Sequence, residues 1–249
     1  QPRLEMNLVG LYELMGIPYT GAPAITLANC QSKFLTKKLL NYHGIKTAKF
    51  QLFDKIPDEF KLETKFPVIV KPAYEDASVG IENESIVSNT NALKKRLEYV
   101  FSQFNQPALI EEFIEGREFN VSVVGDLKPK VLPISEIYFS RMPDHLHNIV
   151  SYQAKWDPHH ESYHKTIPIC PAKISKSLEE KLKHTAITAF KIMGTRDYAR
   201  VDIRVTSDEE VYVLEVNPNP DLTEDAGFMR SAHAAGMSYA QALKKIVML

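Results

Sequence analysis

Apolar residues along the chain recur at two spacings, one typical of helices and one typical of strands. The helical spacing predicts helices at residues 32–44, 89–104, 177–194 and 231–249. Ser177, followed three residues later by Glu180, fits a capping box at the start of the third helix. These segments are long enough to cover the faces of a sheet.

Shorter runs rich in β-branched and aromatic residues predict strands. They lie at residues 45–53, 66–72, 107–116, 117–125, 129–137, 199–206 and 211–217. The last two are joined by residues 207–210, which predicts a hairpin. Helices and strands mix without strict alternation, so the pattern favours an α+β fold over a doubly wound sheet.

A long polar segment, about 138–168, separates the predicted strands from the third helix. It is rich in histidine, proline and tyrosine. Loops of this length inside a compact domain are uncommon and are often functional.

The predicted hairpin carries a carboxylate on each strand. Alternate residues share a face, so Arg200 and Asp202 lie together on the first strand. A turn at the middle of residues 207–210 places Asp202 opposite Glu215, and the same register places Arg200 opposite Asn217. Facing carboxylates repel unless positive charge lies between them. A hard divalent cation with oxygen ligands meets this need better than Arg200 alone. A solvated face with a surface ion pair is the alternative.

Lys71 ends a buried strand and precedes a loop of small residues, 72–80. Backbone N–H groups in such a loop can approach phosphate oxygens. The loop lacks the Gly-Lys-Ser/Thr of a P-loop, so an edge-strand lysine and a plain connector are the alternative. Glu111 and Glu118 lie in or next to apolar strands, where a lone acid often faces solvent.

Composition narrows the class of protein. The 249 residues include 30 basic and 31 acidic side chains, so bulk charge points to neither nucleic acid nor an anionic membrane. No apolar run approaches the roughly 18–20 residues that span a bilayer, and no signal peptide is evident. The two cysteines are too few for a disulfide framework. We expect a cytoplasmic protein, and because Gln1 is not an initiator methionine the chain is compatible with a fragment.

Five motifs in a fixed order carry a family resemblance: VIVKP, ASVG, LIEEFIEGREF, ARVD and LEVN. The chain resembles the ATP-grasp superfamily, and most closely its D-alanine–D-alanine ligase branch, over essentially its whole length. The resemblance implies two α+β subdomains that clasp ATP, at residues 31–107 and 108–249. It implies that residues 1–30 are the tail of a missing N-terminal α/β domain and linker, and that about 138–168 form a lid.

The resemblance also implies contacts for each part of ATP. Lys33 and Lys71 would contact the α- and β-phosphates, and Ser78 would close over the phosphates. Glu111 would face adenine, together with the backbone of Glu112 and Ile114. Glu118 would bind the ribose hydroxyls.

The implied chemistry is carboxylate activation. ATP phosphorylates a small carboxylate, and an amine attacks the acyl phosphate to give an amide, ADP and phosphate. Lys155 in the lid would reach the γ-phosphate, and Arg200 would stabilise the transferring phosphoryl group. Two Mg²⁺ ions, with Mn²⁺ as the alternative, would be held by Asp202, Glu215 and Asn217. Amino acids are candidate substrates, and a homodimer is left open.

Two departures from the ligase pattern bear on the reaction, and the second predicts an altered acceptor. The phosphate loop reads Asp76-Ala77-Ser78 where those ligases usually have Gly-Ser-Ser. Where they carry Pro-Gly-Met-Thr and then a serine, this chain has Pro-Asp221-Leu-Thr and then Ala226. Asp221 would repel a substrate carboxylate and suit an amine. A Mg-ATP-binding module without ligase turnover is therefore the second hypothesis.

A rival motif lies in the polar segment, where His160 to His164 read HESYH and fit the zinc metallopeptidase signature. That signature needs a helix that places both histidines on one face. Pro158 and Pro168 bracket the motif and no apolar stripe surrounds it, so a zinc peptidase is a remote third hypothesis beside a solvated lid.

Overall fold

The computed structural model describes residues 3–139 and 141–249. The helices are α1 (Arg3–Met15), α2 (Ala24–Gln31), α3 (Lys33–Tyr42), α4 (Thr90–Phe104), α5 (Tyr152–Trp156), α6 (Glu161–Lys165), α7 (Lys176–Ile192), α8 (Gly227–Ala234) and α9 (Tyr239–Val247), with the 3-10 turn η1 (Asn83–Ser85). The strands are β1 (Phe50–Phe53), β2 (Val68–Pro72), β3 (Ile86–Val87), β4 (Ala108–Glu112), β5 (Arg117–Val124), β6 (Lys130–Val131), β7 (Ser135–Tyr138), β8 (Ile167–Ile169), β9 (Tyr198–Val205) and β10 (Val211–Asn217).

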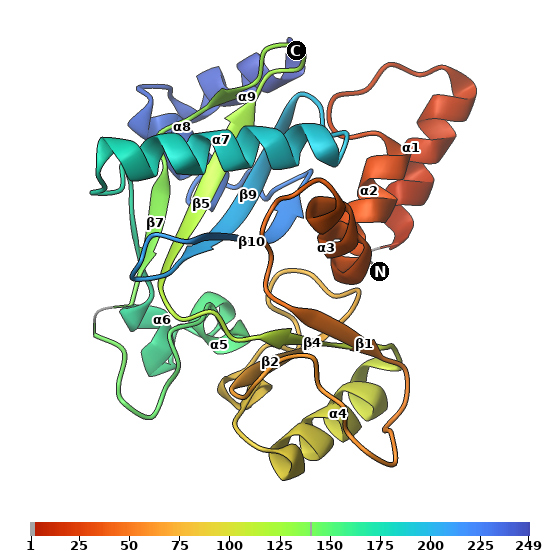
Figure 1. Cartoon of the computed structure of the whole chain (residues 1–249). Coiled ribbons are helices and arrows are strands. Elements are labelled where there is room, and N and C mark those ends of the chain that lie inside the picture. Colours follow the sequence, from red (N-terminus) through yellow and green to blue (C-terminus); the bar gives the residue numbers. More distant parts are fainter. Residues whose placement is uncertain (1–2, 140) are drawn as a thin grey trace.

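The strands form two antiparallel sheets, which confirms the predicted α+β class. The smaller sheet has the order β1-β4-β2-β3, and the larger has the order β10-β9-β5-β7-β8 with β6 beside β5. Figure 1 shows the larger sheet in the upper part of the molecule with α7 lying across it, and the smaller sheet below with α4. Lys71 therefore lies on an interior strand of the smaller sheet rather than on an edge strand.

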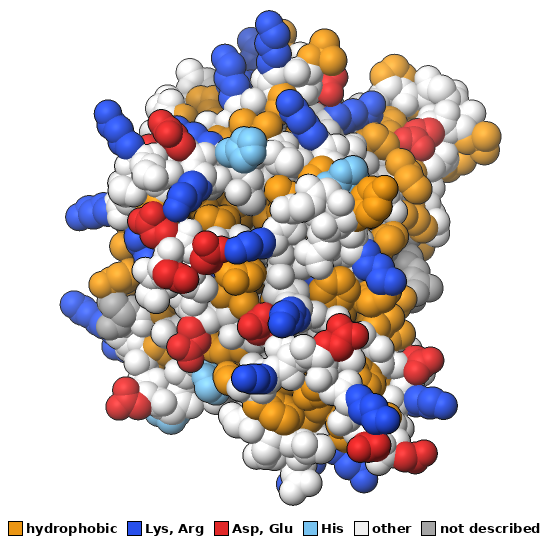
Figure 2. Space-filling view, in the orientation of Figure 1, with side chains coloured by type: hydrophobic (Ala, Val, Ile, Leu, Met, Phe, Trp, Pro, Cys, Tyr) orange, Lys and Arg blue, Asp and Glu red, His pale blue; other side chains and the backbone are white. Residues whose placement is uncertain are grey.

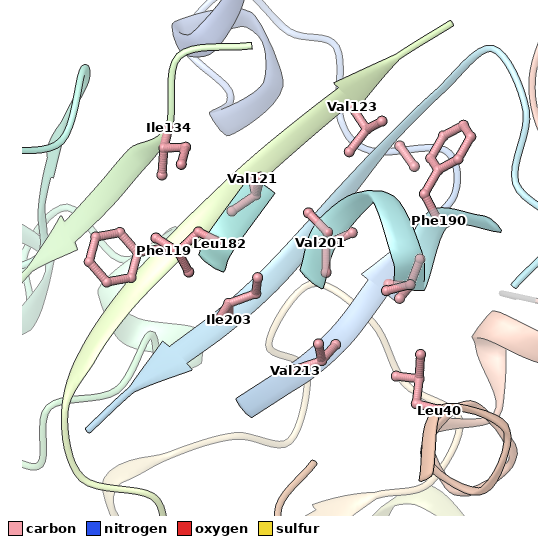
Figure 3. Close-up of a cluster of buried hydrophobic side chains, with 14 of the residues drawn as sticks. Leu40, Phe119, Val121, Val123, Ile134, Leu182, Phe190, Val201, Ile203 and Val213 are labelled. Carbon is pink, nitrogen blue, oxygen red and sulfur yellow. The ribbon is translucent and has the colours of Figure 1, made fainter. Parts of the chain in front are cut away.

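The main core lies between α7 and one face of the larger sheet. Alternate residues of β5, β9 and β10 point toward the helix, and they meet a stripe of apolar side chains along α7 (Figure 3). Phe119, Val201 and Leu182 are fully buried there. Each such side chain stabilises the fold by about 1.5–3 kcal/mol through burial. The opposite face of the same strands is free to carry polar side chains.

A second core holds the smaller sheet against α4. Val68, Val70 and Ile110 from the strands pack with Leu93 and Leu97 from the helix. Asn89 accepts a hydrogen bond from the Ala92 N–H and caps the helix, as the pattern of residues 89–104 predicts. Each sheet thus has its own apolar core.

Two helix boundaries differ from the prediction. Ser175 rather than Ser177 caps α7, because Ser175 has extended backbone angles and its Oγ accepts from the Leu178 N–H. The single helix expected at residues 231–249 is two helices, α8 and α9. Gly236 separates them at φ +83°, and Ser238 caps the second in a capping box with Gln241.

The polar segment is not a plain loop, since it contains α5, α6 and the edge strand β8. Residue 140, which falls in this segment, and residues 1–2 lie outside the described residues.

At the other end of the chain, α1 packs on α2 through Val9 and Leu27 and exposes a row of leucines, among them Leu4, Leu8 and Leu11. Figure 2 shows apolar side chains at the upper right, where Figure 1 places α1, while basic and acidic side chains mix over the rest of that face. Within the described ranges, no helix has both the length and the apolar character needed to cross a membrane.

Candidate active site

The face of the larger sheet that points away from α7 is polar across three adjacent strands. On β9 it carries Arg200, Asp202 and Arg204; on β5, Glu118, Asn120 and Ser122; on β10, Glu215 and Asn217. The period of two that buries valines on the α7 side places these polar residues on the other. The sequence thus builds the core and the candidate site from the same strands.

The predicted hairpin register is right at the acids and differs by one residue at the turn. Asp202 pairs with Glu215 and Arg200 with Asn217, as predicted. Nearer the turn Val213 pairs with Ile203, so the register shifts between Val213 and Glu215. A β-bulge explains the shift, because it places one extra residue on one strand. The bulge brings the two carboxylates face to face.

Asp202 is the centre of a hydrogen-bond network. Arg200 Nε and Nη2 donate to its two oxygens at 2.8 Å each, a bidentate pair. Asn120 Nδ2 donates to Oδ1 at 2.7 Å. Asn217 Nδ2 donates to Asp202 Oδ2 at 3.0 Å and to Glu215 Oε1 at 3.2 Å. One carboxamide therefore links the two carboxylates.

The charges at this end of the site hold Glu215 ionised. Burial alone would raise the pKa of Glu215, but the charges of Lys33 and Arg200 and the hydrogen bond from Asn217 lower it to about 2. Burial raises the pKa of Asp202 above its ordinary value, although Arg200 opposes that shift. Glu215 is therefore firmly ionised. Asp202 beside it is the carboxylate whose ionised form an added cation would stabilise.

The side chains of Asp202, Glu215 and Asn217 suit a hard divalent cation. The part of the chain that the structure describes contains no group of three or more His, Cys, Asp or Glu side chains that could hold a metal. The predicted set instead offers two carboxylates and a carboxamide, Asp202, Glu215 and Asn217. One NH₂ group reaches both carboxylates, so Asp202 and Glu215 each direct an oxygen toward the same atom. Mg²⁺ commonly uses one or two carboxylates and completes its shell with phosphate oxygens and water.

Glu111 is buried between two lysines. Its Oε2 lies 3.0 Å from Lys71 Nζ and 3.4 Å from Lys37 Nζ. Burial opposes its charge, but Lys37 and Lys71 lower the pKa of Glu111 below its ordinary value. Burial lowers the pKa of Lys37, although Glu111 opposes the shift. The side chain predicted to face adenine therefore also anchors the predicted phosphate lysine, Lys71.

Lys33 begins α3 and reaches the small-residue loop. Its Nζ donates to the main-chain oxygen of Glu75 and lies 3.8 Å from Asp76 Oδ1. The acid that departs from the ligase pattern thus has a lysine beside it, although its side chain is 55% exposed. Burial raises the pKa of Asp76, and Lys33 acts against that shift.

The polar segment is docked on the small-residue loop. Ser78 Oγ donates to the main-chain oxygen of Val150 at 2.8 Å, and Trp156 Nε1 donates to that of Ala77 at 2.9 Å. Both Ala77 and Ser78 have positive φ, which bends the loop toward the segment. Ser78 therefore bonds to the backbone of the segment predicted to form a lid.

Lys155, next to Trp156 in α5, lies near Arg200 and the hairpin acids Glu215 and Asp202. Burial and the charge of Arg200 lower the pKa of Lys155, while Glu215 and Asp202 raise it. These charges all act on one amine, so the lid lysine and the hairpin acids lie in one electrostatic neighbourhood. The sequence places them about fifty residues apart.

The residues predicted to bind the base and the ribose lie at the end of β4 and on β5. Arg204 Nη2 donates to Glu118 Oε2, and Arg204 Nη1 donates to the Ile114 main-chain oxygen at 3.2 Å. The Glu112 N–H donates to the Lys49 oxygen at 2.9 Å. Several of these atoms therefore already have protein partners.

The HESYH histidines have separate partners. His160 is the N-cap of α6, and its Nδ1 bonds to Ser162 Oγ at 2.6 Å. His164 Nε2 bonds to the Pro158 oxygen at 2.8 Å, and Glu161 Oε1 bonds to His145 Nε2 at 2.8 Å. A cavity of about 250 Å³ opens beside them, lined by the lid and η1 and by none of the residues predicted for the ATP site. Two histidines on one helical face, as the zinc motif requires, do not occur here.

Three residues of the site escaped the sequence reasoning: Lys37, Asn120 and Arg204. Lys37 lies four residues after Lys33 on the buried side of α3, so a lysine on an apolar stripe was the available signal. Asn120 and Arg204 lie two residues from Glu118 and Asp202, on the same strand faces. Strict alternation along β5 and β9 points to both.

Comparison with known proteins shows which family this chain belongs to. A family model described as "D-ala D-ala ligase C-terminus" matches residues 37–248. A D-alanine–D-alanine ligase of Carboxydothermus hydrogenoformans is 34% identical over 249 residues, covering 96% of this chain and 75% of the relative. An uncharacterized protein of Sinorhizobium fredii, y4sG, is 31% identical over 241 residues, covering 97% and 68%.

Among solved structures, D-alanine–D-alanine ligase from Bacillus anthracis complexed with ATP matches with a TM-score of 0.77 and 29% identity, over 97% of this chain and 72% of that one. Two antiparallel sheets, with lysines and a carboxylate pair between them, define the chain as an ATP-grasp ligase. More narrowly, it belongs to the D-alanine–D-alanine ligase family, through its C-terminal part. The predicted ATP-grasp fold, the class of ATP-dependent carbon–nitrogen ligase and ATP with Mg²⁺ as cofactor are confirmed.

Proposed function

We propose that the chain is a carboxylate–amine ligase that works through an acyl phosphate and has an altered acceptor site. A carboxylate oxygen attacks the γ-phosphorus of ATP and ADP leaves. An amine nitrogen then attacks the acyl carbon and displaces phosphate, which gives an amide. The observation that supports this most is the bidentate Arg200–Asp202 pair beside Glu215.

Arg200 and Lys155 supply positive charge where the transferring phosphoryl group gathers negative charge. Arg200 is held in place by Asp202, so it needs no reorganisation when that charge develops. The metal set, Asp202, Glu215 and Asn217, would hold Mg²⁺, which neutralises phosphate oxygens when bound. The ionised form of Glu215, with a pKa of about 2, suits that role across the physiological range.

The nucleotide would lie between the lysines and β4. Lys33 and Lys71 bind the α- and β-phosphates, and the loop that bears Ser78 covers them. The contacts assigned to the base and the ribose are Glu111, the backbone of Glu112 and Ile114, and Glu118. The charges of Lys33 and Lys71 both act on Glu215, which supports one continuous site.

The same proposal divides the chain by role. Residues 31–107 and 108–249 form two subdomains that clasp ATP, and about 138–168 form the lid. Separate cores in the two sheets support two bodies, although Leu40 of α3 packs in the core of the larger sheet. The hydrogen bonds of Ser78 and Trp156 support the role of the lid.

The acceptor end would differ from that of a D-alanine-adding enzyme. Asp221 accepts from the Thr223 N–H and Oγ at 2.9 Å each. These hydrogen bonds, with Lys155 and Arg200 nearby, lower the pKa of Asp221 although burial opposes them. An ionised Asp221 would attract an amine and repel a carboxylate that came close to it.

ADP release by the full-length chain tests this proposal. We expect release to require both a carboxylate and an amine, and Glu215→Ala to reduce it by at least 100-fold, because the metal and its charge are lost. Glu209→Ala, in the exposed turn of the same hairpin, is the matched control and should leave the rate unchanged. Full turnover in Glu215→Ala contradicts the metal assignment. ATP binding without ADP release for any pair contradicts ligase activity and supports the Mg-ATP-binding module.

A further inference from the structure

A buried arginine on β9, Arg204, lies where three parts of the molecule meet. Its side chain is only 4% exposed. Nη1 donates to the main-chain oxygen of Asn148 at 3.1 Å and to that of Ile114 at 3.2 Å, and Nη2 donates to Glu118 Oε2. One guanidinium thus bonds to the lid, to the connection between β4 and β5, and to the side chain that the proposed function assigns to the ribose.

Aromatic rings from the lid and from the β4–β5 connection pack around the same guanidinium. The ring centroids of Phe139, at the start of the lid, and of Phe113, between the two strands, each lie 5.8 Å from Arg204 Cζ. Phe113 also meets the lid directly, because its ring lies edge-on against His147 at a centroid distance of 6.0 Å. The docked lid therefore helps to enclose Arg204.

Stability alone does not account for this arginine. Its Nε is buried and has no hydrogen-bond partner within the described ranges. Removing a guanidinium from water costs free energy that its ion pair and hydrogen bonds only partly return, so an apolar side chain of similar volume is often as stable in such a place. A buried cation that joins a lid to a ligand-binding acid is better explained by a role in binding.

The planar guanidinium links the orientation of Glu118 to the position of the lid. Both N–H groups of Nη1 are in use, so Asn148 and Ile114 together hold the plane in one orientation. That orientation directs Nη2 at Glu118, and Arg204 is the one hydrogen-bond partner of this carboxylate among the described residues. Undocking of the lid removes the Asn148 oxygen, which leaves the guanidinium, and Glu118 with it, freer to turn.

We propose that Arg204 is a positioning residue that couples recognition of the ribose hydroxyls to docking of the lid. A nucleotide whose ribose donates to an oriented Glu118 then favours the docked lid. The docked lid in turn strengthens binding of that nucleotide by the same factor, because coupling between two binding events is reciprocal. This inference rests on the proposed function for the nucleotide contact of Glu118 and for the lid, and it concerns regulation of that same site.

The test measures hydrogen exchange of the lid amides in the full-length chain saturated with Mg·ADP or with Mg·2′,3′-dideoxy-ADP. The second nucleotide keeps the base and the phosphates and lacks both ribose hydroxyls. We expect Mg·ADP to slow exchange across residues 141–168 at least fivefold more than the dideoxy nucleotide does. In Arg204→Met the two nucleotides should protect the lid equally, because Glu118 is no longer tied to it.

Two further variants separate coupling from a folding defect. Arg204→Lys keeps a charge beside Glu118 but lacks the planar fork that spans the two main-chain oxygens, so it should fold and lose most of the difference. Arg117→Met is the matched control, because Arg117 lies next to Glu118 on β5 and pairs with another buried carboxylate, Glu136, at 2.7 Å. It should keep the full difference. Affinity for the dideoxy nucleotide close to that of the wild type shows that each variant is folded.

Equal protection by the two nucleotides in the wild type would overturn the coupling, and so would a full difference retained in both Arg204 variants. Equal protection in a chain that still ligates overturns the coupling alone and leaves the proposed function standing. An Arg204-dependent difference in a chain that releases no ADP would refute the ligase proposal while sustaining the coupling.

Discussion

Several charged side chains in this molecule are buried, which disfavours their ionised form, and oppositely charged neighbours compensate for that cost. Glu111 and Lys37 are fully buried, Glu111 ionised and Lys37 3.4 Å away. Glu111 Oε1 and Lys37 Nζ have no hydrogen-bond partner in the structure. A buried pair of this kind adds little stability in itself, but loss of one member leaves the other uncompensated.

Lys37→Met tests that interdependence. We expect it to lower the free energy of unfolding by about 3–5 kcal/mol, because Glu111 then keeps only Lys71 as a charged partner. The double variant Lys37→Met/Glu111→Gln should recover part of the loss, since only the charge of Lys71 then remains beside that position. Urea unfolding measures both, with Lys38→Met on the same helix as control. A loss below about 1 kcal/mol in Lys37→Met would show that the pair is dispensable.

At the scale of elements, the lid and the hairpin bring distant residues to one place. Trp156 and Ser78 tie the lid to the loop after β2, and Lys155 comes with it. The β-bulge near Val213 aligns Glu215 with Asp202. The two hydrogen bonds and the bulge each involve only a few residues, but they bring together side chains that are far apart in the sequence.

The lid contact makes a direct prediction. Trp156→Phe removes the hydrogen bond to Ala77 and keeps an aromatic ring, so the lid should open more often. We expect about a fivefold faster cleavage of the lid by protease in the presence of Mg·ATP, which corresponds to one hydrogen bond of about 1 kcal/mol. Tyr152→Phe, at the start of the same helix, serves as control. An unchanged cleavage rate in Trp156→Phe would mean that this bond does not hold the lid.

Periodicity predicts most of the elements and less of the site. The strand face of Asp202, Glu215 and Asn217 follows from alternation and hairpin pairing, so the sequence is sufficient there. The two-helix end of the chain was missed because Gly236 interrupts a continuous apolar spacing. The partner of Lys37 could not be assigned, because a lysine on the buried side of α3 does not indicate which distant carboxylate packs beside it.

At the scale of the whole molecule, two sheets with separate cores meet at one charged site. Lys33 from the first part, and Arg200 from the second, both act on Glu215. Such a site is suited to holding phosphates between two bodies and to excluding water when the lid is docked. The family match explains the architecture, and the departure from the ligase pattern at Asp221 supports the proposed altered acceptor site.

The proposed reaction begins when a carboxylate oxygen attacks the γ-phosphorus of ATP. The most direct measurement uses a donor carboxylate labelled with ¹⁸O, the full-length chain, Mg·ATP and an amine, with the released phosphate examined by mass spectrometry. We expect each phosphate released with the amide to carry one ¹⁸O atom, because that oxygen leaves with phosphorus when the amine attacks. ADP formed with unlabelled phosphate would mean hydrolysis by water and would contradict the ligase mechanism.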